Sequence, residues 1–496
     1  MARGKKAAPG LTPEEKLVQA LVPVEEQPYQ IPDNWCWIQL NYIKKDKDSF
    51  FDGDWILSSD MDSDGDVRLL QLSDIGIGDF LDKSDKHISF STYKKLNCTK
   101  LCAGDVMISR MAEPIARSCI VPEFSYTAIT AVDVAIMRCN SAVIINRFLN
   151  YLCNTPWFTD LAFSRARGTT RVRITRANLG EMPLPLPPLS EQQRIVDRIE
   201  SIFAKLDEAK EKAQAVVDGF ELRKSAILHK AFTGELTAKW REERKLHSNK
   251  SFECVQKELL KINRKKIKKV INNSTLPEIP SEWRYVELDE VAKQITDGEH
   301  STPERVDDYC GYYLLSARNV RDDAMKLDDV DYISQKEYER ISRRCNPQKG
   351  DVLISCSGSV GRVCVINDDN YYAMVRSAAM VSVVKCNPRF IMYMIMAEPV
   401  QREIQQLSKQ TAQANLFIGA IAALKIPFAA VEEQNEIVHI LDSLIKKEKQ
   451  AKEAAESVLD QIDTMKKAVL ARAFRGELGT NDPAEESVVE LLKSVL

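Results

Sequence analysis

The chain carries the same unit twice, and this duplication limits its fold more than any other feature of the sequence. Residues 31–40 (IPDNWCWIQL) match residues 279–288 (IPSEWRYVEL), an offset of 248. From about Gly168 to Leu236 the offset stays at 242 without a gap, whereas it drifts through the earlier matches. A repeat of this size is a duplicated domain pair rather than a solenoid. Each copy is therefore predicted to hold a variable part followed by a part of rigid length.

A long helix is predicted for the part of rigid length. It follows Pro187-Pro188, and Ser190 with Gln193 forms the pattern of a capping box. Apolar or small residues then recur at alternating steps of four and three, which is a coiled-coil signature. The seam candidates are Ile199, Ile202, Leu206, Ala209, Ala213, Val216 and Phe220 in the first copy and Leu441, Leu444, Ala451, Ala455, Val458 and Ile462 in the second. Arg223 and Glu448 each interrupt one copy of the seam.

Two such helices in one chain most simply pack on each other. If they pack antiparallel, a rotation of about 180° exchanges the two copies, and a helix of about 40 residues spans about 60 Å. The variable parts would then be held at opposite ends of a stiff rod. The alternative is that the seam serves only oligomerisation, but the gapless offset favours a spacer of measured length.

The variable parts are predicted to be mixed and rich in short strands. The fold class is therefore α+β, with two such domains separated by two long helices that pack as an antiparallel coiled coil, in a pseudo-two-fold internal duplication. The expected divisions are an N-terminal tail or short helix at 1–29, a variable domain at 30–187, a helical region at 188–236, a basic linker at 237–278, a second variable domain at 279–429, a second helical region at 430–479 and a C-terminal tail at 480–496.

Composition and charge restrict the function. The net charge of −3 counts against a simple DNA binder, unless charge is segregated along the chain or partners supply phosphate contacts. Residues 237–275 are strongly basic, with a cluster at 264–269; they read as a surface linker, and a nucleic-acid contact is the alternative. Scattered cysteines and only five histidines give no metal-ligand spacing. No run approaches about 18 apolar residues, so we expect no membrane span and a cytoplasmic location.

Motifs for catalysis are incomplete. Asn154-Thr155-Pro156-Trp157 is the nearest approach to the loop of an amine methyltransferase, but it lacks the second proline. A phosphate-binding GxxxxGK[ST] loop is missing from the sequence. The chain is therefore expected to have no catalytic centre of its own.

Residues suited to DNA binding are better represented. Five arginines fall within twelve residues that contain no acid, around Gly168. Guanidinium groups bind phosphates or read guanine, and hydroxyls add phosphate contacts. The matching stretch of the second copy, residues 408–415, is rich in amides, which suit adenine. The candidates are Arg165, Arg167, Thr169, Thr170, Arg171, Arg173 and Arg176 in the first half and Ser355, Ser357, Arg362, Arg376, Lys409, Gln410, Gln413 and Asn415 in the second. Two copies with different DNA-contacting side chains at matching positions suit an asymmetric DNA site of two parts.

The assembled motifs resemble the specificity subunits of type I restriction-modification systems. The resemblance rests on PPLSEQQRIV at 187–196, AFTGEL at 231–236 running into TAKWR, DGDWI at 52–56 with QLSDIG at 71–76, and DGEHSTP at 297–303. It covers nearly the whole chain beyond residue 14. The second copy departs from it where AAVEEQN at 429–435 replaces the PPLSEQQ entry.

The resemblance implies a role in DNA recognition within a larger complex. Each variable domain would be a target recognition domain that reads half of a split site in double-stranded DNA, and the helices would set the unread gap. Two methyltransferase subunits would carry S-adenosylmethionine, and restriction/translocase subunits would use ATP and Mg²⁺; this chain would bind no cofactor. The alternatives are a modification-only complex, a fused DNA-modifying enzyme, or a coiled-coil scaffold that binds no DNA.

Overall fold

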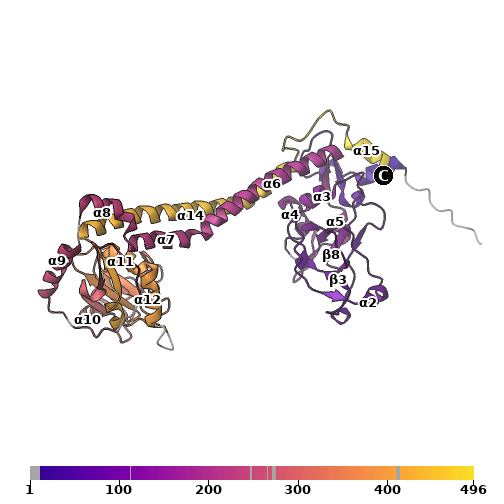
Figure 1. Ribbon diagram of the computed structural model, residues 1–496. Helices are drawn as coiled ribbons and strands as arrows, with labels where there is room; N and C mark the ends of the chain where they lie inside the picture. Colours follow the sequence, from indigo (N-terminus) through magenta and orange to yellow (C-terminus); the bar gives the residue numbers. More distant parts are fainter. Residues whose placement is uncertain are drawn as a thin grey trace, which may run out of the picture. The chain divides into compact units, whose positions relative to one another are not determined.

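The chain divides into two compact units. The computed structural model describes residues 12–111, 113–245, 248–264, 266–270, 275–408 and 414–495. Unit 1 comprises Met1–Ala213 and Ser457–Leu496, and unit 2 comprises Gln214–Glu456 (Figure 1). Unit 1 is therefore assembled from the two ends of the chain, whereas unit 2 is one continuous stretch.

The described residues of unit 1 form three small sheets. In spatial order, their strands are β2 (Phe50–Asp52), β8 (Val134–Met137), β5 (Val106–Ser109) and β6 (Ser118–Ile120); β4 (His87–Ile88), β3 (Val67–Leu70) and β7 (Thr127–Thr130); and β1 (Cys36–Gln39) with β9 (Pro183–Leu186). Neighbours are antiparallel except for the parallel pair β3 and β7.

Unit 2 repeats this topology. Its sheets, in spatial order, are β11 (Ala292–Asp297), β19 (Ala378–Val383), β16 (Val352–Ser355) and β17 (Val363–Val365); β15 (Asp331–Tyr332), β12 (Tyr312–Leu315) and β18 (Tyr371–Met374); and β10 (Arg284–Glu287) with β20 (Lys425–Phe428). The pair β12 and β18 is again parallel. A further hairpin is formed by β13 (Val320–Arg321) and β14 (Ala324–Met325). The repeat in the sequence is therefore a repeat of the fold, with mixed helix and strand content.

Helices cover the sheets of each unit and connect them to the long helices. Unit 1 contains α1 (Pro13–Ala20), α2 (Phe90–Lys95), α3 (Asn146–Cys153), α4 (Pro156–Arg165), α5 (Arg176–Gly180), most of α6 (Leu189–Asp218) and α15 (Val488–Val495). Unit 2 contains α7 (Phe220–Phe232), α8 (Ala238–Arg244), α9 (Ser248–Leu260), α10 (Gln335–Ser342), α11 (Pro388–Met396), α12 (Glu398–Ser408) and α13 (Ile418–Ala422). Helix α14 (Val431–Ala473) contributes to both units. Within the described residues, no helix has the length and apolar character needed to cross a membrane.

A buried tryptophan–glutamate hydrogen bond ties the first strand of each unit to the start of its long helix. Trp35 Nε1 donates to Glu191 Oε2 over 2.7 Å, and Trp283 Nε1 donates to Glu433 Oε2 over 2.9 Å. Both glutamates are fully buried. Burying a carboxylate is costly unless hydrogen bonds compensate it, so these bonds fix the position at which each helix leaves its sheets.

The two buried glutamates have different remaining partners. Glu433 Oε1 accepts from Thr237 Oγ1 and from Arg241 Nη1, both at 2.7 Å, so in unit 2 its charge is balanced. Glu191 accepts instead from Asn481 Nδ2, at 2.9 Å, in the C-terminal segment. The last residues, expected as a tail, therefore pack into unit 1, where Val488 and Leu492 of α15 are buried.

The neighbouring glutamines reinforce both junctions. Gln192 Oε1 accepts from Ile145 N, and Gln434 Oε1 accepts from Asn387 N, each over 2.9 Å. The side-chain amides donate back to the chain just before each helix, at Pro187 O and Ala429 O. The departure AAVEEQN in the second copy keeps the Glu-Gln pair, so the junction is preserved.

The long helices contact each other within each unit. In unit 1, Lys466 Nζ lies 2.5 Å from Asp207 Oδ1, and Lys210 Nζ lies 3.9 Å from Asp463 Oδ1. In unit 2, Arg223 Nε lies 2.7 Å from Glu448 Oε2. The residue numbers rise on one helix as they fall on the other in unit 1, which is an antiparallel arrangement. The two residues that interrupt the predicted seam form an ion pair with each other.

Two details of the helix prediction are wrong. Ser190 does not cap α6: it lies within the first turn, and its hydroxyl donates to Glu485 Oε1 over 2.6 Å. Ala451 and Val458, placed in the seam, are exposed, whereas Ala455 and Ile462 are buried. A straight α-helix drifts about 20° per heptad from a strict seven-residue track, so a pattern counted in heptads loses the buried face.

We predict that removing the two glutamates has unequal effects. Glu433→Ala should lower the free energy of unfolding by about 3–5 kcal/mol, because it leaves the Arg241 guanidinium buried without its partner. Glu191→Ala should cost less, about 1–3 kcal/mol, since its partners are neutral. Guanidinium unfolding followed by tryptophan fluorescence measures both. The exposed neighbour Glu432 supplies the control variant, Glu432→Ala, which should leave the midpoint unchanged; equal effects of Glu191→Ala and Glu433→Ala would contradict the assignment.

Candidate nucleic-acid interface

The arginine-rich segment of unit 1 forms a closed loop between α4 and α5. The backbones of Arg167 and Arg173 bond to each other in both directions, each N···O distance being 2.9 Å. Gly168 adopts φ +123°, and a Cβ there would lie 2.4 Å from Arg171 O. Glycine is required at this position because L side chains rarely adopt such a φ. The loop therefore has one defined shape.

The five arginines of this segment divide into two groups. Arg165 Nη1 donates to Glu181 O over 3.1 Å, and Arg176 Nη1 donates to Phe50 O over 3.1 Å. Arg173 Nη2 donates to Val132 O over 3.3 Å. These three guanidinium groups hold the loop against the sheet.

The loop tip presents the other candidates. Arg167, Thr169, Thr170 and Arg171 are exposed. Within the described part of the chain, the side chains of Arg167 and Arg171 form no hydrogen bond or ion pair. Because each carries an uncompensated charge into solvent, these two arginines are the ones best suited to bind phosphate or a base edge.

Sequence reasoning missed one arginine of this surface. Arg110 follows β5; its Nε donates to Ile174 O over 3.2 Å, and its Nη1 pairs with Asp52. Burial, together with the neighbouring positive charge of Arg173, lowers the pKa of Arg110 to about 10. Directly after the repeated strand, the first copy has Arg110 where the second copy has Cys356. This difference between the copies is the signal that could have revealed it.

A cavity lies at the corresponding place in unit 2. It has a volume of about 470 Å³ and lies where Ser357 and Asn415 pair through their backbones. Asp297, His300, Arg376 and the exposed Phe417 are among the residues that line it. Asp297 Oδ1 accepts from Arg344 Nη2 over 2.6 Å, and Asp297 Oδ2 lies 2.7 Å from His300 Nε2.

The candidates of the second half do not all reach this cavity. Ser357, Arg376 and Asn415 line it. The prediction that Ser355 is a DNA contact is wrong, because this residue is fully buried. Its hydroxyl donates to Ser359 O over 2.6 Å and stabilises the turn after β16. Arg362 is half-buried directly before β17 and does not line this cavity. Lys409, Gln410 and Gln413 lie outside the described residues.

The repeated Asp-Gly pairs have a structural explanation. A Cβ at Gly53 would lie 2.1 Å from Ala131 O, and one at Gly298 would lie 2.0 Å from Met374 O. Glycine lets the two backbones approach, and this places Asp52 and Asp297 at matching positions in the two units. Arginines thus surround the aspartate of unit 1, whereas the surface of unit 2 adds a histidine, an amide, a serine and an aromatic ring to its arginines, Arg344 and Arg376.

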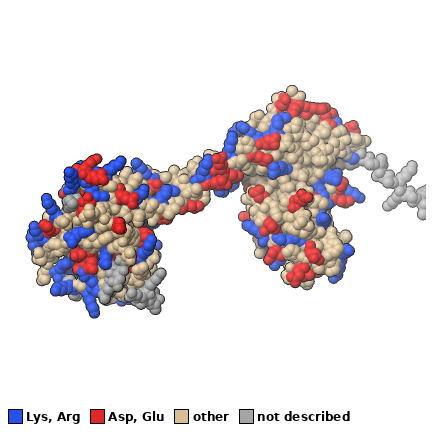
Figure 2. All heavy atoms as spheres, viewed as in Figure 1, with Lys and Arg blue, Asp and Glu red and all other residues tan. Residues whose placement is uncertain are grey.

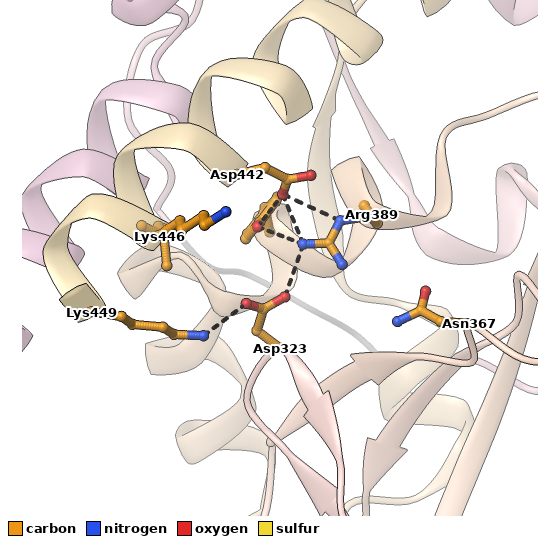
Figure 3. A pocket seen from close by; sticks show the side chains of 8 residues that line it. Asp323, Asn367, Arg389, Asp442, Lys446 and Lys449 are labelled. Carbon is orange, nitrogen blue, oxygen red and sulfur yellow. Dashed lines mark hydrogen bonds and ion pairs between the residues drawn. The ribbon is translucent and has the colours of Figure 1, made fainter. Parts of the chain in front are cut away.

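A second polar cavity of unit 2 connects α11, α14 and the hairpin β13–β14 (Figure 3). Arg389 Nη2 lies 2.7 Å from Asp442 Oδ1 and 3.0 Å from Asp323 Oδ1, and Lys449 Nζ lies 3.2 Å from Asp323 Oδ2. Tyr393 Oη donates to Asp442 Oδ1 over 2.6 Å. Burial raises the pKa of Tyr393, and its hydrogen bond to Asp442 raises it further, so the phenol stays protonated.

Unit 1 contains the counterpart of this cluster. Arg147 Nη1 lies 2.5 Å from Glu200 Oε1, at the positions that match Arg389 and Asp442. In both units the charges connect a short helix of the sheet region to the long helix. We interpret these clusters as joints that fix the long helix against its unit, rather than as ligand sites. Among the described residues, no group of His, Cys, Asp or Glu is arranged to hold a metal ion.

The charge on the visible surface is mixed. Figure 2 shows Lys and Arg interspersed with Asp and Glu on both units in that view. The face seen in that view is therefore not uniformly basic, and DNA contact on it would depend on local groups.

The same fold thus occurs twice in this chain, with a distinct polar surface on each copy. A family model described as the type I restriction modification DNA specificity domain matches residues 52–217 and 280–457. These two matches cover more than half of the chain, one in each copy. The chain therefore belongs to the family of type I restriction-modification specificity subunits, as the motifs predicted.

Individual relatives agree with this assignment. The chain is 24% identical over 336 residues to the specificity subunit of the type I restriction enzyme EcoBI from Escherichia coli, a match that spans 66% of this chain and 65% of that subunit. It is 34% identical over 110 residues to the StySPI specificity subunit from Salmonella potsdam, over 22% of this chain and 23% of that one.

Two solved structures share the fold. The HsdS subunit from Thermoanaerobacter tengcongensis matches with a TM-score of 0.59 at 20% identity, over 92% of this chain and 100% of that chain. A chain from a structure that addresses complex assembly and conformational transition of the type I R-M system matches with a TM-score of 0.62 at 18% identity, over 91% of this chain and 100% of that chain.

We predict that Arg171 supports DNA binding alone, whereas Arg173 supports both DNA binding and the stability of the fold. Arg171→Ala should weaken DNA binding and lower the slope of log K against log salt by about 0.9, as for one lost phosphate contact, without changing the melting temperature. Arg173→Ala should weaken binding and also lower the melting temperature, because it removes the bond to Val132 O.

Filter binding at several salt concentrations and thermal unfolding measure these effects. Arg198→Ala, on the exposed face of α6, is the control for loss of an arginine. If Arg171→Ala reduced subunit assembly as much as DNA binding, a direct DNA contact would be ruled out.

Proposed function

We propose that this chain is the DNA-recognition subunit of a type I restriction-modification complex and performs no catalysis itself. The observation that carries the proposal is the duplication: one fold occurs twice and presents different polar side chains at equivalent places. In unit 1 these are chiefly arginines, which suit phosphate and guanine, whereas Asn415 in unit 2 suits adenine. Two different readers in one chain suit a bipartite, asymmetric DNA site.

We further propose that the long helices form an antiparallel coiled coil that relates the two units by a pseudo-two-fold axis. The contacts within each unit support this: Asp207 with Lys466 in unit 1 and Arg223 with Glu448 in unit 2. On this proposal the helices set the length of DNA left unread between the half-sites. Half-sites about one duplex turn apart follow the geometry of two-headed readers.

On this proposal, partner subunits catalyse the methylation and cleavage of DNA. Two methyltransferase subunits would carry S-adenosylmethionine, and restriction/translocase subunits would supply ATP-driven movement and Mg²⁺-dependent cleavage. A modification-only complex remains the second candidate, since it would use the same recognition subunit. Both candidates require this chain to direct methylation to a split DNA sequence, and methylation mapping of host DNA with and without this gene tests that role. Without the gene, methylation should be lost at one split sequence. An unchanged pattern would refute both candidates.

We predict that a change in one unit alters only one half of the recognised sequence. Asn415→Ala should relax base choice in one half-site, and Arg171→Ala should affect only the other. Each substitution removes a group from one reading surface only, so the opposite half should keep its preference. Sequencing of the DNA fraction bound from random duplexes measures both halves at once; a loss spread over both halves would argue against independent readers.

We predict that the helices act as a ruler. A heptad inserted after Ala213, matched by one after Ala455, should change the preferred gap between the half-sites while leaving both half-sites unchanged. The added residues lengthen each helix by about 10 Å, at 1.5 Å per residue. The same selection from random duplexes reads the gap. An unchanged gap would refute the ruler, and insertion of a heptad in one helix alone serves as the mismatched control.

A further inference from the structure

The basic linker between the two copies is folded onto unit 2. After α9, residues 262–264 and 266–270, here named the strap, follow the edge of the sheet that begins with β11. Arg264 Nη1 donates to Asp289 O over 2.6 Å and to Ala292 O over 3.2 Å. Ile267 packs against the core of unit 2. The strap therefore has fixed contacts at its start and at its middle.

The far end of the strap contacts α13. Val270 N donates to Gly419 O over 3.3 Å, and a Cβ on Gly419 would lie 2.5 Å from Lys268 O. Only glycine allows the strap backbone to approach so closely. The matching residue of unit 1 is Ala177, whose side chain would not permit this approach.

The strap closes one side of a cavity of about 630 Å³ that is lined with cationic groups. Arg264, Lys266, Lys293 and Arg344 contribute positive charge to its walls. Its two acids already have partners: Asp289 pairs with Arg264, and Asp297 pairs with Arg344. Lys266 and Lys293 are exposed and form no ion pair within the described part of the chain. The cavity therefore has an excess of positive charge directed at solvent.

This cavity adjoins the candidate reading surface. Asp297 and Ile418 line both it and the cavity that contains Asn415 and Phe417. A duplex whose bases were read at Asn415 would have its backbone close to the strap. Phosphates are the ligands that exposed lysines at the edge of a reading surface most commonly bind.

We propose that the strap is a phosphate clamp, in which Lys266 and Lys293 bind the DNA backbone beside the half-site that unit 2 reads. The inference rests on the proposed function and adds a binding site to it that unit 1 builds differently, from its arginine loop. A basic strap also explains how a chain of low net charge can bind DNA. Residues 237–275 contain twelve lysines and arginines against four glutamates, within a chain of net charge −3. Charge is thus segregated along the chain.

The test uses the complex purified from its host through a tag on this chain. The double variant Lys266→Ala/Lys293→Ala should lower the slope of log K against log salt by about 1.8, as for two lost phosphate contacts. Affinity for specific and for random duplexes should fall by the same factor, so the sequence preference stays unchanged. Lys261→Ala is the matched control, because Lys261 lies just before the strap and pairs with Glu258.

A second variant moves the strap without removing charge. Gly419→Ala should reduce the salt slope in the same direction, since its Cβ displaces the strap from α13. An unchanged slope in the double variant would overturn the clamp, and an unchanged slope in Gly419→Ala would overturn the role of the strap in placing Lys266. Loss of partner subunits from the double variant, with DNA affinity of the remaining complex intact, would assign the surface to protein docking instead. If the unmodified complex bound no preferred sequence at all, the proposed function itself would fail.

Discussion

The whole architecture depends on two buried glutamates. Glu191 and Glu433 each accept the indole N–H of the tryptophan directly before the first strand of their unit, at the point where a long helix begins. A carboxylate removed from water must keep its hydrogen bonds, so its position is tightly defined. Any error in the direction of the helix at this point would grow along the helix. The angle between the sheets of a unit and its long helix is therefore set by a few buried bonds rather than by the helix itself.

Much of the fold could be predicted because its signals are local or repeated. Two copies of one unit, strand-rich regions and long helices all leave periodic patterns in the sequence. The family assignment, made from short motifs, is confirmed. The phase of the seam could not be predicted to the residue, as Val458 shows: it fits a heptad track yet is 40% exposed, because small angular differences accumulate along a helix.

The candidate reading surfaces could be predicted only in outline. An arginine-rich loop is evident from sequence, but which arginines are available depends on partners far away in the chain. Arg176 is engaged by Phe50 O, and Arg173 by Val132 O. A hydroxyl such as that of Ser355 looks available in a sequence and is buried in the fold. Arg110 was missed because a single residue after a strand forms no pattern.

The split construction of unit 1 has a consequence for synthesis. Unit 2 is a continuous stretch, Gln214–Glu456, so all of its residues are made before Ser457–Leu496 of unit 1. Unit 1 combines Met1–Ala213, made before unit 2, with Ser457–Leu496, made after it and including Asn481, which bonds to Glu191. Domains fold as units while the chain emerges. Unit 1 is thus begun before unit 2 and completed after it, so a nascent chain must carry an unfinished unit 1 while unit 2 is made.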